Sequence, residues 1–268
     1  MYKSRITRYL TRTLLLMLLT GSVAAQAAGK HKLPAFHAQY AALFMGMKVA
    51  EADYDLSHTA NGYTFSQKTR LYGLAGMLRK DTVDAVSHVE EEDGQLLLQK
   101  HEYRQRSSGD NRDESYSISW DKTTTPVTGT ITGSYNGKPV KLTSKGPVWE
   151  PLSFQLPLML EASTDKKKYP YKAILKGEIN TYHFVLVASH TVHFAGKDYQ
   201  ALEVVRTDPR KGKDRQLHIW LIPELHNIPF LIENYRDGKL HSRMKLEQLQ
   251  INNGKKLTQA HNDSDDEF

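Results

Sequence analysis

The stretch VAEADYDLSHTANGYTFSQKTRL, residues 49–71, decides the fold class. From Val49 to Ser57, apolar and acidic side chains alternate, which is the pattern of a strand with one buried and one solvated face. Asn61-Gly62 follows, and Tyr63 to Leu71 alternates again. Asn-Gly between two alternating runs is a strong signal for a tight hairpin turn. The stretch therefore predicts two antiparallel strands joined by a hairpin.

The same alternation recurs along most of the chain. A second hairpin is predicted where Phe230 to Tyr235 and Leu240 to Leu249 flank Asp237-Gly238. Further strands are predicted at Arg79 to Val89, Gln95 to Tyr103, Glu114 to Trp120, Val127 to Thr132, Tyr182 to Val187, Tyr199 to Arg206 and Gln216 to Ile222. Successive strands without helical patterns between them indicate a meander and not a parallel α/β sheet. We expect an all-β, mainly antiparallel fold: a large curved meander sheet or an open or closed β-barrel, with one short helix packed on or in it.

The segment Pro147 to Ala162 breaks the alternation. It places apolar residues at helical spacing, namely Leu152, Leu156, Met159 and Leu160. Pro151 suits a first helical turn, whereas Pro157 should kink or end a turn. We expect a short helix, either continuous or broken at Pro157, that joins two halves of the domain near residues 147–165. A long hydrophobic loop is the alternative.

The first residues have the layout of a secretory signal peptide. Residues 1–13 carry four basic and no acidic side chains, and an apolar run from Leu14 to Ala25 follows. Ala25-Gln26-Ala27 supplies a cleavage signal, so cleavage is expected after Ala27, with Ala28 as the second choice. An apolar run of about a dozen residues is short against the roughly 20 needed to span a bilayer, which disfavours an uncleaved anchor.

This layout predicts three parts. They are a signal peptide at residues 1–27, a single β-rich domain at 28–251 and a disordered polar tail at 252–268. Removal of the leader lowers the formal net charge from +6 to +2. Such a balance gives little reason to expect nucleic acid as a partner. The chain has no cysteine, which excludes disulfides, thiol catalysis and the lipidated cysteine of a bacterial lipoprotein. We expect a soluble exported protein with no stable membrane insertion after cleavage.

The common catalytic and metal motifs are missing from the sequence. It contains no G-x-S-x-G, no H-E-x-x-H and no P-loop. Two S-x-x-K matches begin at Ser119 and Ser163, but the first ends a predicted strand and the second follows the predicted helix. The densest histidines lack the spacing that would place metal ligands on one face of a strand, namely His183, His190, His193 and His218. We therefore predict no catalytic residue, cofactor or metal site.

A basic cluster occupies residues 208–215. Such a cluster is either a binding site for a phosphate or lipid headgroup, or the exposed charge of a surface loop. The second interpretation is the expectation here.

Three short motifs resemble the domain-of-unknown-function family 3108 of exported Gram-negative proteins. They are Tyr40 to Gly46 (Y-x-x-x-x-x-G), Pro151 to Leu156 (PLSFQL), and a closing set made of Trp220, Pro223, Pro229 and Ile232. The similarity spans roughly Phe36 to Leu249, and the family often has an aspartate where this chain has Glu150 and Glu224. The resemblance implies a periplasmic β-rich domain, similar in outline to curved-sheet carriers of lipid or acyl chains. It brings no established reaction, cofactor or catalytic residues.

Two functions from different classes remain open. The first is a non-enzymatic periplasmic binding or chaperone-like protein that carries a lipid or other apolar ligand in its curved sheet; its protein partner is unknown. The second is an envelope hydrolase whose site is not visible as a motif. For the first, the expected ligand-binding residues are Leu74, Met77, Leu78, Phe154, Leu156 and Met159. Leu74 to Leu78 would gate the mouth of the cavity, and methionine side chains adapt to varied acyl chains.

Overall fold

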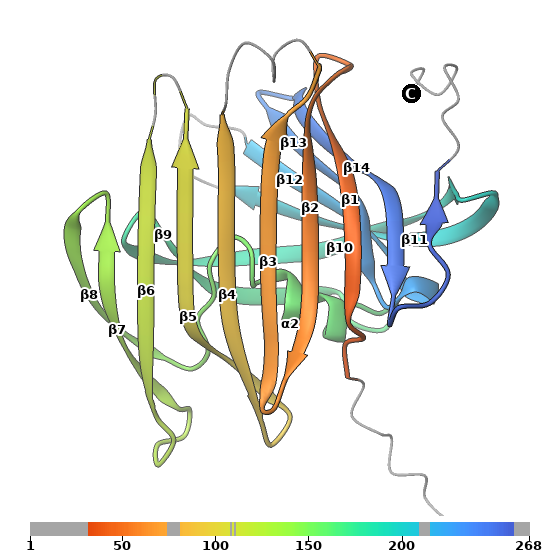
Figure 1. The fold of residues 1–268 in the computed structure, drawn as a ribbon. Helices are drawn as coiled ribbons and strands as arrows, with labels where there is room; N and C mark the ends of the chain where they lie inside the picture. Colours follow the sequence, from red (N-terminus) through yellow and green to blue (C-terminus); the bar gives the residue numbers. More distant parts are fainter. Residues whose placement is uncertain (1–31, 74–80, 108, 110, 209–214, 260–268) are drawn as a thin grey trace, which may run out of the picture. The chain divides into compact units, whose positions relative to one another are not determined.

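In the computed structural model, residues 32–73, 81–107, 109, 111–208 and 215–259 are described, and they form one antiparallel sheet of 15 strands (Figure 1). The predicted signal peptide and the candidate residues Leu74, Met77 and Leu78 lie outside the described residues.

The strands of the first half are β1 (Phe36–Phe44), β2 (Met47–Thr59), β3 (Gly62–Leu71), β4 (Thr82–Glu92), β5 (Gln95–Arg106), β6 (Arg112–Asp121), β7 (Thr128–Tyr135) and β8 (Lys138–Lys145). The helix α2 (Gln155–Glu161) follows. The second half contains β9 (Lys168–Leu175), β10 (Glu178–Phe194), β11 (Lys197–Asp208), β12 (Arg215–Ile222), the 3-10 turn η1 (Pro223–Leu225), β13 (Ile228–Arg236), β14 (Lys239–Ile251) and β15 (Leu257–Thr258).

The sheet consists of two meanders joined at the first strand. Its order runs from β8 back to β1, then from β14 back to β9. β1 pairs with β2 on one side and with β14 on the other, so that Tyr40 lies across from both Ala52 and Leu246. The prediction of a mainly antiparallel β fold with one short helix is confirmed.

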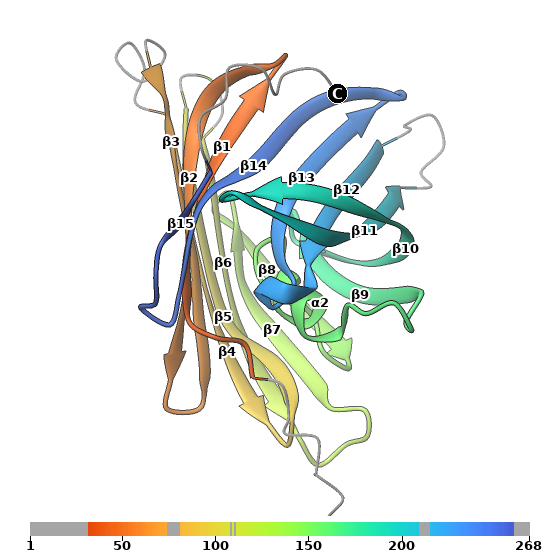
Figure 2. The same ribbon diagram turned by 90° about the vertical axis from the view of Figure 1, so that its right-hand side faces the viewer.

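The sheet is strongly curved and open. Figure 2 shows β9 to β13 curving over to the side opposite β2 and β3, with α2 between them. Among the described residues, no ladder joins the end strands β8 and β9. The gap is crossed by an isolated parallel bridge, in which Trp149 donates to Lys172 O (2.9 Å) and accepts from Ile174 N (2.8 Å). The turn at Gly177 also approaches β8, since an added Cβ there would lie 3.1 Å from Val140 Cγ2.

The helix is shorter than the apolar spacing predicted, and it is not broken. Pro151 lies in the turn before α2, and Pro157 is the third residue of the helix. The first residues of a helix have no intrahelical acceptor for their N–H groups, so a proline is accommodated there without a kink. The expected kink at Pro157 was therefore wrong. No helix in the described part of the chain is long and apolar enough to cross a membrane.

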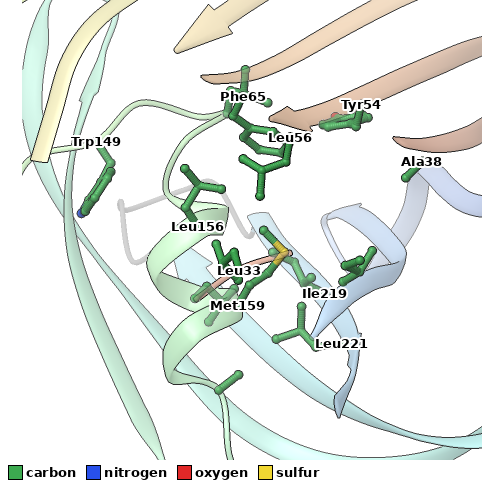
Figure 3. Close-up of a cluster of buried hydrophobic side chains, with 14 of the residues drawn as sticks. Leu33, Ala38, Tyr54, Leu56, Phe65, Trp149, Leu156, Met159, Ile219 and Leu221 are labelled. Carbon is green, nitrogen blue, oxygen red and sulfur yellow. The ribbon is translucent and has the colours of Figure 1, made fainter. Parts of the chain in front are cut away.

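The main core lies between α2 and the inner face of the sheet. Leu156 and Met159, which are 0% and 2% exposed, point among side chains from the two halves, including Leu56 and Leu221 (Figure 3). A fully buried side chain of this size contributes about 1.5–3 kcal/mol through burial of its apolar surface. The helix therefore supplies core that the curved sheet does not provide by itself.

The segment that follows β14 returns to the sheet and pairs with it. Asn252 N donates to Ala35 O at 2.8 Å, and β15 pairs with β14 through Leu257 and Leu249. The Gln259 side chain accepts a hydrogen bond from Ala195 N at 3.1 Å. Backbone pairing thus holds residues 252–259 of the expected polar tail against the sheet, and residues 260–268 lie outside the described part.

Candidate functional site

A pocket of about 320 Å³ lies where the turn leading into α2 meets the inner face of the second half of the sheet. Its volume falls within the range of about 300–1,000 Å³ that is usual for small-molecule sites. Most of its wall is apolar or aromatic, including Phe154, Tyr182, Phe184, Leu217, Ile232 and Met244. Tyr54 of β2 contributes from the first half of the sheet.

Stacked rings form one side of the pocket. Phe154 and Phe184 lie with their centroids 5.1 Å apart and their planes 20° from parallel, and Tyr171 is 6.1 Å from Phe184. Next to them, the Arg206 guanidinium carbon lies 4.7 Å from the centroid of Tyr182. The pocket therefore combines a flat aromatic wall with a positive charge held against one of the rings.

A buried hydroxyl is left without a partner at this wall. Tyr171 is 6% exposed, and its Oη has no hydrogen-bond partner among the described residues. Burial, followed by the Glu161 carboxylate and Tyr169, raises the pKa of Tyr171 well above its usual value, so the group is a neutral donor. A buried polar group without a partner costs about 1–3 kcal/mol, which an acceptor on a bound molecule would recover.

The residues expected from the sequence lie at different depths. Phe154 lines the pocket, whereas Leu156 and Met159 are in the core beneath it. Leu74, Met77 and Leu78 lie outside the described residues, so their part in a mouth stays a prediction. Apart from Tyr54, Pro151 and Gln155, the remaining wall comes from β9 to β14. Alternation in the sequence marks one face of each strand there, but it does not reveal that these faces meet α2.

Ser87, His101 and Glu150 form a second, fully buried polar cluster. Ser87 Oγ donates to Glu150 Oε1 at 2.6 Å and lies 3.0 Å from His101 Nδ1. His101 Nδ1 is 3.4 Å from Glu150 Oε2. Glu150 also accepts the backbone N–H groups of Leu152 (2.6 Å) and Ser153 (2.9 Å).

These are the residue types of a hydrolase triad, but their arrangement is different. The Ser87 hydroxyl donates to the carboxylate, whereas a nucleophilic serine donates to the histidine that takes its proton. Ser87 is 0% exposed, so no substrate reaches its Oγ in this conformation. The cluster instead holds the turn before α2 against β4 and β5. The sequence alone did not indicate it, because the three residues come from separate segments.

Two of the histidines singled out in the sequence contact one carboxylate on the outer face of the sheet. His190 Nε2 lies 2.7 Å and His218 Nδ1 2.6 Å from the oxygens of Glu203. Burial raises the pKa of Glu203, but the two histidine hydrogen bonds outweigh it and hold this pKa below its usual value. Across the residues with described positions, no three histidine or acidic side chains are grouped to hold a metal ion.

Comparisons with known proteins give a family and a fold. A family model described as "Protein of unknown function (DUF3108)" matches residues 36–245. No curated protein matches the chain. Among solved structures, the chain is similar to a β-barrel-like protein of the domain of unknown function DUF1849 from Brucella abortus. The two share 14% identity with a TM-score of 0.54, over 82% of this chain and 98% of the other, so the likeness concerns the fold alone.

Proposed function

We propose, from the premise that this chain belongs to the DUF3108 family of proteins of unknown function, that it is a non-enzymatic binding protein for a small apolar ligand. The ligand occupies the pocket beside Phe154 and Phe184. The observation that carries the proposal is an aromatic wall that includes Tyr171, a residue whose buried hydroxyl has no partner among the described residues. A concave apolar site with a few polar groups is the usual form of a small-molecule site.

The proposal places the protein in the periplasm. The leader at residues 1–27 supports export, and the family resemblance supports a cell with two membranes. A binding protein in this compartment would hold an apolar molecule away from water between the two membranes.

The alternative of an envelope hydrolase has weaker support. Its best candidate residues, Ser87, His101 and Glu150, are buried and serve to fix the turn before α2. The proposed role therefore needs no chemical step.

Binding of the uncharged fluorescent probe N-phenylnaphthylamine tests the proposal. The purified protein should bind the probe with a blue-shifted emission, because the pocket wall is apolar. Asn234→Trp places a large side chain at an exposed position on the pocket wall, and it should abolish binding. Thr143→Trp, at an exposed position of β8, is the matched control and should bind like the wild type. Absence of probe binding to the wild type at micromolar protein, or equal binding by Asn234→Trp, would overturn the proposal.

A further inference from the structure

The inner face of β11 to β14 changes from apolar to basic along the strands. Three successive cross-strand rows show this change. The row beside α2 is apolar and consists of Val204, Ile219, Ile232 and Met244. The next row is mixed and consists of Arg206, Leu217, Asn234 and Ser242.

The third row, nearest the β13–β14 turn, is basic. It consists of Asp208, Arg215, Arg236 and Lys239. Since side chains two positions apart on a strand share a face, Arg215 and Arg236 lie on the same face as Leu217 and Asn234, which line the pocket. Arg215, Arg236 and Lys239 give the row three cations, and Arg206 adds a fourth cation one row below.

Arg215 and Arg236 oppose each other directly in the ladder. Like charges at directly opposite positions of two strands are destabilising. Among the side chains whose positions are described, which leaves out that of Asp208 opposite Arg215, neither arginine has an ion pair or hydrogen bond, and both arginines are exposed. An anion bound between them would relieve this repulsion, and the planar guanidinium suits a carboxylate or a phosphate.

We propose that this basic row is a headgroup site, so that the pocket takes a single-chain amphiphile with an anionic head. The inference rests on the proposed binding function and names its ligand class. The apolar chain lies along Ile219 and Ile232, while the carboxylate or phosphate head lies between Arg215 and Arg236. The volume of about 320 Å³ is at the low end for small-molecule pockets, which fits one chain and not two.

Displacement of N-phenylnaphthylamine by amphiphiles that share one tail tests the headgroup separately from the pocket. The four competitors are dodecanol, dodecyltrimethylammonium, dodecanoate and dodecyl phosphate, each below its micelle concentration. The two anionic competitors should displace the probe at concentrations about tenfold lower than the other two. The anion that displaces the probe at the lower concentration, dodecanoate or dodecyl phosphate, identifies the head as a carboxylate or a phosphate.

The double variant Arg215→Gln/Arg236→Gln should lose about three- to tenfold in affinity for the anionic competitors and nothing for dodecanol. The matched control is Arg104→Gln, which replaces an exposed arginine of β5, outside the strands β11 to β14 that carry the basic row. An unchanged thermal midpoint in the double variant shows that its loss of affinity does not come from unfolding. Higher salt should reduce the difference in displacing concentration between the anionic and the other competitors.

Equal displacement by all four competitors, or an anionic advantage that the double variant keeps, would overturn the headgroup site and leave the pocket intact. Failure of the wild type to bind the probe at all is a separate result, which removes the binding function and the headgroup site with it.

Discussion

Ser87 of β4 donates a hydrogen bond of 2.6 Å to Glu150, 63 positions further along the chain. This contact fastens the turn before α2 to the first half of the sheet. The bridge made by the neighbouring Trp149 fastens the same segment to β9 in the second half. The position of Phe154, and with it the pocket wall, depends on these two adjacent residues.

Glu150→Ala should therefore lower the free energy of unfolding by about 3 kcal/mol, since it leaves the backbone N–H groups of Leu152 and Ser153 buried without their acceptor and removes the contact with Ser87. Urea denaturation measures the change. Glu161→Ala removes an exposed carboxylate paired with Lys166 and should cost less than about 1 kcal/mol. Equal midpoints for the two variants would contradict the anchoring role.

Gly133→Ala should destabilise the protein by about 1–3 kcal/mol through overpacking in the first half of the sheet. An added Cβ at Gly133 would lie 1.9 Å from the backbone oxygen of Ser115 on β6, which cannot give way as a side-chain end does. Gly109→Ala meets nothing within 4 Å and should leave the thermal midpoint unchanged. A neutral Gly133→Ala would mean that β6 and β7 are further apart than described.

The lowered pKa of Glu203 predicts a loss of stability in acid. A carboxyl group with a depressed pKa in the folded state contributes stability above its unfolded pKa, here the usual 4.5, and loses it as the pH falls through the folded value. Denaturation from pH 6 down to about pH 3 should therefore show a smaller decline for Glu203→Gln than for the wild type. Parallel declines would show that the two histidine contacts contribute nothing.

Protein recovered from the periplasm should lack residues 1–27, because the leader combines basic charge, an apolar run and a small-residue cleavage signal. Intact-mass spectrometry measures the new N-terminus, expected at Ala28 or Gly29. Retention of Met1 on periplasmic protein would contradict cleavage.

The strands were predictable because alternation is a local property of the sequence. The hairpin at Asn61-Gly62 appears as β2 and β3, with Leu56 across from Phe65 on the buried face. The pairing of β1 with β14 was not predictable, since no local pattern specifies partners as distant along the chain as Tyr40 and Leu246.

The pocket shows the same limit. Phe154 could be proposed from its place beside the predicted helix, but Arg206 and Tyr171 become neighbours of that helix only through the curvature of the sheet. The basic cluster at residues 208–215 was expected to be ordinary loop charge. The cross-strand register places Arg215 of that cluster opposite Arg236, a relationship that neither segment indicates alone.

The pairing of β1 with β14 also bears on the order in which the sheet is completed during folding. β1 to β8 can pair among themselves early, but the free edge of β1 waits for residues 239–251, which lie far along the chain. An exposed strand edge is a site for intermolecular association, and distant pairings form slowly. The folding chain therefore passes through a stage in which its first strand is unprotected, and a chaperone that covers this edge would be most needed in that interval.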